Sequence, residues 1–144
     1  MPKNCRRSDC PISFSLDIFG DKWSLLILRD MIFIGKRTYG EFANSDEKMA
    51  TNILADRLSV LENAGVIKKK KDKEKKSRFI YSVTDKGIEL LPVLLEIIKW
   101  GATYDKDTVA PKAFVDRIKN DKEKLMKEII EGIKNNKPLF APIP

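Results

Sequence analysis

One segment in the first half of the chain carries side chains that can recognise DNA bases. Its small or polar members are Thr51, Asn52, Ala55, Asp56, Arg57 and Ser59. The amide of Asn52 can pair with adenine, and Thr51 and Ala55 can contact the methyl group of thymine. Asp56 can accept a hydrogen bond from cytosine or hold Arg57 in place. Taken alone, such a segment is more typical of an ordinary amphipathic surface helix, so both interpretations stay open.

A lysine-rich run follows at residues 68–78, between predicted strands at 66–71 and 78–83. Its basic members are Lys68, Lys69, Lys70, Lys71, Lys73, Lys75, Lys76 and Arg78. With two acidic residues among them, the run has a net charge of +6, almost all of the chain's +7. Such a hairpin can neutralise phosphates along DNA, although a hairpin kept basic for solubility is the alternative. Its position directly after a candidate recognition helix favours DNA.

Catalysis and metal binding find little support in the sequence. The chain has no histidine, which removes the commonest general base and the commonest zinc ligand. The two cysteines, Cys5 and Cys10, cannot complete a four-ligand zinc site without carboxylates. No glycine-rich phosphate loop and no convergent set of carboxylates is evident. We therefore expect no enzyme, no cofactor and no metal.

The basic balance of the chain favours a polyanionic partner, either nucleic acid or an anionic membrane surface. The most apolar run, residues 88–100, carries Glu89, Glu96 and Lys99 and is shorter than the ~20 apolar residues of a membrane span. The first residues lack the apolar core of a signal peptide. We therefore expect a cytoplasmic protein with no membrane partner.

The recognition segment should lie on a helix over residues 51–64. Leu54, Leu58 and Leu61 recur at i, i+4 and i+7, so they form a stripe that anchors this helix to a core. The opposite stripe is the polar one, which leaves it free to face the major groove.

Two further signals position the helices that come before it. A helix over residues 22–34 is apolar nearly all round, which predicts a buried position. Asp21 is its expected N-cap, and Gly35 is placed to end it. Thr38 and Glu41 fit a capping box that starts another short helix.

A long helix over residues 85–102, bent at Pro92, carries two apolar stripes. One stripe can cover its own domain, whereas the other needs a partner surface. The second stripe consists of Leu90, Leu94, Ile97 and Trp100. We expect a homodimer that places two recognition helices ~34 Å apart on a pseudo-palindromic operator in double-stranded DNA. A helix buried wholly inside the monomer is the alternative.

The order of elements predicts a mainly α fold with a small β-hairpin: a winged helix-turn-helix with C-terminal dimerisation helices. Residues 1–101 would form the DNA-binding domain with the first dimer helix. Residues 102–144 would form a helical tail that takes part in the dimer interface. The predicted function is sequence-specific, DNA-binding transcriptional regulation, and the alternative is a winged-helix protein-interaction module without specific DNA binding.

Several short strings stand in order over roughly residues 5–101. They are CPI at 10–12, DIFGDKWSLLILR at 17–29, RTYGEF at 37–42, TNILADRL at 51–58, LENAGVI at 61–67, YSVTDKG at 81–87, LPVL at 91–94 and WG at 100–101. Through these strings the chain resembles the HxlR-type winged-helix regulators, relatives of the MarR group.

The resemblance implies a dimeric, cytoplasmic, bacterial-type transcription regulator. It implies that residues 51–59 enter the major groove and that residues 68–78 form the wing. In many members of this family the cysteine that matches Cys10 senses electrophiles or oxidants, so a redox or small-molecule effector is expected. Cys5 is an additional cysteine, and Ala50 stands where a serine N-cap is usual in the family.

Overall fold

The structure is a computed structural model that describes residues 6–140. Its elements are α1 (Pro11–Phe19), α2 (Ser24–Arg29), the π-helix η2 (Asp30–Ile34), α3 (Tyr39–Ala43), α4 (Thr51–Asn63), β1 (Ile67–Lys71), β2 (Phe79–Val83), α5 (Asp85–Ile88), α6 (Leu91–Tyr104), α7 (Lys112–Asn120) and α8 (Lys122–Lys134). The prediction of a mainly helical chain with one hairpin is confirmed.

A single hydrophobic core joins the helices. Leu28 of α2, Leu54 and Leu61 of α4, Leu95 of α6 and Leu125 of α8 are all fully buried in it. The anchor stripe predicted for α4 is therefore confirmed. Because the core includes residues of α8, the C-terminal helices pack on the same body as the winged helix instead of forming a separate unit.

The helix predicted over residues 22–34 is a shorter α-helix that continues as a π-helix. The N-cap position is Trp23, so the assignment of Asp21 to that position is wrong. The Asp21 carboxylate nevertheless accepts hydrogen bonds from the backbone N–H groups of Trp23 and Ser24, at 2.8 and 2.9 Å, and so satisfies two donors of the first turn. Gly35 ends η2 in the left-handed conformation, as expected.

The helix-turn-helix begins with the predicted capping box, which is confirmed. The hydroxyl of Thr38 accepts from the backbone N–H of Glu41, and the Glu41 carboxylate accepts from the backbone N–H of Thr38, both at 3.2 Å. These reciprocal bonds fix the start of α3.

The hairpin pairs β1 with β2 in antiparallel register, with Ile67 opposite Val83 and Lys71 opposite Phe79. Tyr81 is the buried residue of β2, and its ring packs edge-on against Phe42 of α3 with centroids 6.0 Å apart. This contact holds the wing against the helix-turn-helix.

The long helix predicted over residues 85–102 is divided into α5 and α6. Thr84 caps α5 by accepting from the backbone N–H of Gly87. Pro92 lies in the first turn of α6, where its missing N–H leaves no hydrogen bond unmade. Pro92 therefore starts a new helix, and the expected bend of a continuous helix is wrong.

The tail packs through aromatic contacts. Phe114 of α7 lies edge-on to Phe33 of η2 at 6.0 Å and to Phe140 at 5.5 Å, and the backbone N–H of Phe140 donates to the carbonyl of Phe33. The boundary predicted between residues 101 and 102 falls inside α6.

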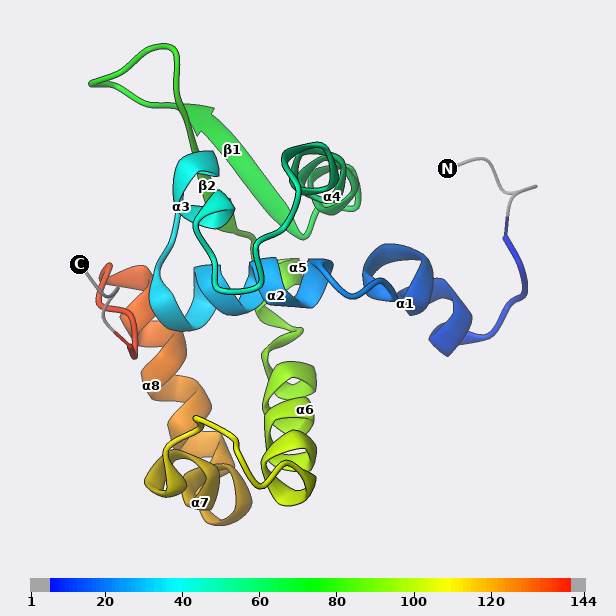
Figure 1. Cartoon of the computed structure of the whole chain (residues 1–144), viewed down its shortest axis with the longest axis vertical. Coiled ribbons are helices and arrows are strands. Elements are labelled where there is room, and N and C mark those ends of the chain that lie inside the picture. Colours follow the sequence, from blue (N-terminus) through cyan, green and yellow to red (C-terminus); the bar gives the residue numbers. More distant parts are fainter. Residues whose placement is uncertain (1–5, 141–144) are drawn as a thin grey trace.

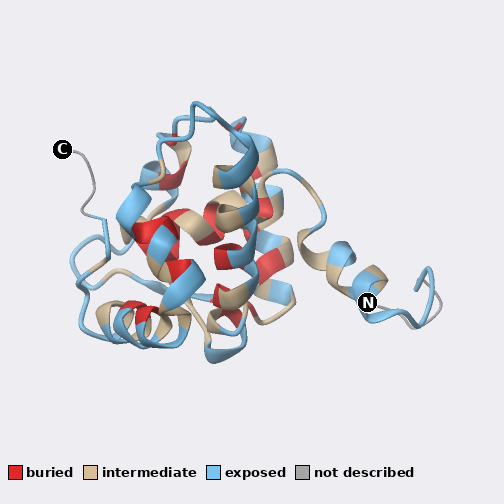
Figure 2. Cartoon of the chain, turned by 90° about the horizontal axis from the view of Figure 1, so that it is seen from below, coloured by how far each residue is buried: buried red, intermediate tan, exposed pale blue. Residues whose placement is uncertain are grey.

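The arrangement separates two ends of the molecule. Figure 1 shows α4 and the hairpin at one end, with α6 and α7 at the other. α1 projects sideways from the body, and Figure 2 shows that the buried residues gather in the body and not on this helix. Within residues 6–140, no helix has both the length and the apolar character needed to cross a membrane.

Candidate nucleic-acid interface

The polar side of α4 is solvent-exposed. Thr51, Asn52, Ala55, Asp56 and Ser59 are all exposed, whereas the leucines of the opposite stripe are buried. The helix therefore presents small and polar side chains to solvent along its first two turns, which is the surface that a recognition helix requires.

The N-terminus of α4 presents backbone donors. Its N-cap residue is Ala50, and no side chain in the described part of the chain makes the usual capping hydrogen bond there. The phenol of Tyr39 in α3 donates to the Thr51 carbonyl at 2.8 Å and ties the two helices together. Uncapped N–H groups at a helix N-terminus suit a phosphate oxygen.

Arg57 is held by two carboxylates. It forms an ion pair with Asp56, as one of the two sequence interpretations expected, and a second with Asp21 at 3.1 Å. Burial raises the pKa of Asp21, but hydrogen bonds from Ser24, Trp23 and Arg57 outweigh it and leave that pKa below the ordinary value. Arg57 thus links α4 to the segment before α2.

The cations of the wing fall into two groups. Lys69 pairs with Glu62 of α4 at 3.7 Å and stacks over the Phe79 ring at 4.6 Å. Arg78 pairs with Asp72, whose pKa is lowered by hydrogen bonds from the Glu74 N–H and from Arg78. The others are exposed and have no ion pair within residues 6–140: Lys68, Lys70, Lys71, Lys73, Lys75 and Lys76.

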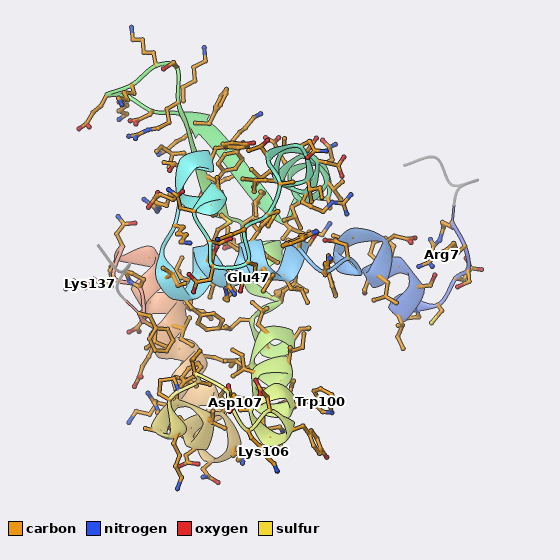
Figure 3. All side chains as sticks on the ribbon, viewed as in Figure 1. Arg7, Glu47, Trp100, Lys106, Asp107 and Lys137 are labelled. Atoms are coloured by element: carbon orange, nitrogen blue, oxygen red, sulfur yellow. The ribbon has the colours of Figure 1, made fainter. Side chains whose placement is uncertain are left out.

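The polar side of α4 and the lysine run lie at the same end of the molecule. The Lys69–Glu62 pair joins β1 directly to α4, and nitrogen-tipped side chains fan outward from the hairpin in Figure 3. The tip of the hairpin extends beyond α3 and α4 (Figure 1). The arrangement can contact a duplex through a helix and a basic finger at the same time.

Comparison with known proteins agrees with this geometry. A family model described as HxlR-like helix-turn-helix matches residues 18–109, well over half of the chain. The uncharacterized HTH-type transcriptional regulator YdeP of Bacillus subtilis is 36% identical over 108 residues, which cover 72% of this chain and 84% of YdeP. The chain belongs to the HxlR-like helix-turn-helix family.

Two solved structures extend the comparison. PA1607 superposes with a TM-score of 0.65 at 39% identity and covers 74% of each chain. HypR, a redox regulator solved in its oxidized form, superposes with a TM-score of 0.60 at 27% identity over 69% of this chain and 100% of its own. As a member of this family, the chain is a DNA-binding transcriptional regulator, and the family's regulators are not enzymes.

The apolar stripe that α6 exposes shares two of its four predicted residues, Ile97 and Trp100, with the stripe expected from the sequence. Leu94 is buried in the core and Leu90 packs against it, so the assignment of Leu94 to an exposed stripe is wrong. Ile97 and Trp100 are 48% and 68% exposed, and Trp100 points away from the body in Figure 3. Sequence analysis missed Val93 and Tyr104, which continue this exposed stripe at helical spacing.

The described cysteine, Cys10, precedes α1 and is exposed. The backbone N–H groups of Ser13 and Ile12 hold the pKa of its thiol below the ordinary value. The nearby basic residues are engaged elsewhere, since Arg6 lies 3.8 Å from Asp9 and Arg7 lies 3.0 Å from Asp17. The thiolate is therefore favoured by the helix N-terminus. Cys5 lies outside the described residues.

Proposed function

We propose that this chain is a cytoplasmic homodimer that binds a pseudo-palindromic DNA operator. By recognising this specific sequence it regulates transcription. The observation that carries the proposal is the position of the exposed polar side of α4 and the basic hairpin at one end of the molecule, away from the exposed apolar stripe of α6 (Figure 1). One end suits DNA and the other suits a second copy.

In the proposed complex α4 lies in the major groove. Asn52 pairs with adenine, while Thr51 and Ala55 contact thymine methyl groups. Because Asp56 and Arg57 pair with each other, they position the helix more than they read bases. Ser59 extends the contact along the same side of the helix.

The wing supplies charge, not sequence information. The six exposed lysines without ion pairs in the described chain reach phosphates or the minor groove, whereas Lys69 and Arg78 brace the hairpin through Glu62 and Asp72. Each phosphate contact adds ~0.9 to the slope of log K against log salt.

The proposed dimer covers apolar surface that is exposed in the single chain. Ile97 and Trp100 of α6 are its central residues, with Val93 and Tyr104 continuing the surface on either side, while Leu90 of the predicted stripe is half-buried against the core. α1 supports the same conclusion: none of its nine residues, all of them described, is buried, and Ile12 and Leu16 are 70% and 48% exposed. A helix this short is unstable without packing, so a second copy is the expected cover. Participation of the tail in this interface stays a prediction.

A redox or electrophile response through Cys10 is the proposed input. The exposed thiol and its lowered pKa support reactivity, because the thiolate is the reactive form. HypR, which is similar in fold, is described as a redox regulator. A role for Cys5 stays a prediction.

The test is a titration of DNA taken from upstream of the chain's own gene, followed by fluorescence anisotropy at 50 and 200 mM salt. We expect tight binding that falls steeply with salt and exceeds binding to a scrambled duplex. Equal, weak binding to both duplexes would favour the alternative, a winged-helix protein-interaction module.

A further inference from the structure

A cavity of about 300 Å³ lies where the winged helix meets the C-terminal tail. Its walls come from the end of η2, from β2 of the wing and from the end of α8 with the residues that follow it. Ile34, Val83 and Ile133 give it an apolar surface. The volume is at the lower limit for small-molecule sites, so it suits a ligand of one ring or a short branched chain.

The charge around the cavity is positive. Lys36 and Arg37 line it, and none of the lining residues, which all belong to the described chain, is acidic. Lys36 lies 3.4 Å from buried Asp30, and Arg29 pairs with both Asp30 at 2.8 Å and Glu47 at 2.7 Å, so these two carboxylates balance the charges of Lys36 and Arg29. Arg37 is exposed and has no side-chain ion pair within residues 6–140. Arg37 is therefore the lining residue whose positive charge is free to meet an anionic group of a ligand.

The wing adds the hydroxyl-bearing residue Ser82 to the lining of the cavity. Ser82 stands directly opposite Lys68 in the hairpin register. Tyr81 and Val83 line the cavity as well, although their side chains point to the opposite face of the strand from Ser82, so the cavity lies along the edge of β2 and Lys68 is not part of its lining. An apolar body with one negative charge matches these surroundings.

The cavity also touches a hydrogen bond that positions the wing. The backbone N–H of Tyr81 in β2 donates to the carbonyl of Arg37 at 2.7 Å. Arg37 directly precedes Thr38, the cap of α3. A ligand held between Arg37 and Ser82 therefore lies beside this hydrogen bond, and it shifts DNA affinity if it favours one position of the wing.

We propose that this cavity binds a small organic carboxylate with an apolar body, and that its occupancy changes the affinity for DNA. The outer wall, residues 132–138, lies beyond residues 18–109 that match the family, so this site is a property of the tail. The binding site stands on its own geometry, while the effector role rests on the proposed function.

The first experiment is calorimetric titration of the full chain with benzoate, without DNA. Benzamide has the same ring without the charge, so we expect it to bind ~10-fold more weakly, the value of one charge-assisted hydrogen bond. Acetate has the charge without the ring, so we expect it to bind at least ~10-fold more weakly because the apolar surface of the ring is no longer buried. Arg37→Gln should weaken benzoate binding by a similar factor. Lys134→Gln removes one positive charge at an exposed residue of α8 that does not line the cavity, and it should leave benzoate binding unchanged.

Lack of benzoate binding, or equal binding by the Arg37→Gln and original chains, would overturn the site. The second experiment repeats the DNA titration with saturating benzoate, where we expect a change in DNA affinity of ~5- to 150-fold. Benzoate binding without such a change would overturn the effector role. Because the calorimetry contains no DNA, failure of the site is distinguishable from failure of the proposed DNA binding.

Discussion

The two ends of the molecule are built alike, but they expose side chains of opposite character. At one end, α4 and the hairpin expose charge and small polar groups around buried leucines. At the other, α6 exposes Ile97 and Trp100 while its opposite side enters the same core. Each end is a helix with one anchored side and one presented side. The chemistry of the presented side, and not the helix itself, determines which partner each end can bind.

The largest effect is expected from Trp100→Glu, which places a charge in the exposed apolar stripe of α6. If this stripe is the dimer surface, the variant becomes monomeric and DNA affinity falls by ~10²- to 10⁴-fold, since the gain from two linked sites is lost. Sedimentation velocity measures the first change and fluorescence anisotropy the second.

Val109→Glu is the matched control, because Val109 is 98% exposed in the segment between α6 and α7. The Val109→Glu variant should remain dimeric. Circular dichroism checks that the Trp100 variant folds, and Ile97→Lys provides a second disruption of the same stripe. If the Trp100→Glu and Ile97→Lys variants both remained dimeric, the proposed interface would be contradicted.

The next effect concerns the basic end. Changing Lys71, Lys73 and Lys75 to Glu removes three exposed cations from the hairpin. We expect the slope of log K against log salt to fall by about 3, if each lysine contacts one phosphate. Affinity should decrease on all sequences alike. The control is the same triple reversal at Lys124, Lys127 and Lys134, on the exposed side of α8, which changes net charge equally. Equal losses in both triple variants would mean that only overall charge matters.

Asn52→Ala tests sequence recognition within the same end. The variant should lose ~1–3 kcal/mol of binding free energy on the preferred operator, with a smaller loss on duplexes substituted at the contacted base pair. Asn63→Ala, at the exposed C-terminal end of α4, should bind as the original chain does. A uniform loss across all duplexes would indicate that Asn52 does not read a base. Competition anisotropy with single-substituted duplexes gives the comparison.

The smallest effect concerns Cys10, at the N-cap position of the projecting α1. The lowered pKa means that the thiolate persists to a lower pH than in an ordinary thiol, and that reactivity disappears as pH falls through the lowered value. Alkylation rates with iodoacetamide, measured across pH in a Cys5→Ser chain, should have their midpoint below that of an ordinary thiol. Unfolding in urea should move the midpoint up. An unchanged midpoint would contradict stabilisation by the helix N-terminus.

Local signals were enough to predict much of the fold. The capping box at Thr38 and Glu41 and the leucine stripe of α4 involve residues within one or two turns, so their spacing carries the information. The exposed polar side of α4 follows from the same spacing. These features did not depend on knowing any distant contact.

Long-range packing explains the remaining errors. α6 is apolar on nearly all sides, so its sequence does not reveal that Leu94 enters the core while Val93 is exposed. Contacts with residues distant in sequence determine which side of α6 is buried. The ion pairs that divide the wing cations, such as Lys69 with Glu62, likewise depend on how β1 packs on α4. The cavity requires α8 to contact η2, which periodicity within α8 does not specify.

Gly35 is restricted by two independent features, its backbone conformation and the ring packed against it. Gly35 has a φ of +82°, and a Cβ atom built there would lie 2.9 Å from a ring carbon of Pro138. Any other residue would strain the backbone and also push the tail away from the winged helix. A change near residue 138 would relieve the contact but not the left-handed backbone conformation, so we expect position 35 to stay glycine even where residue 138 varies.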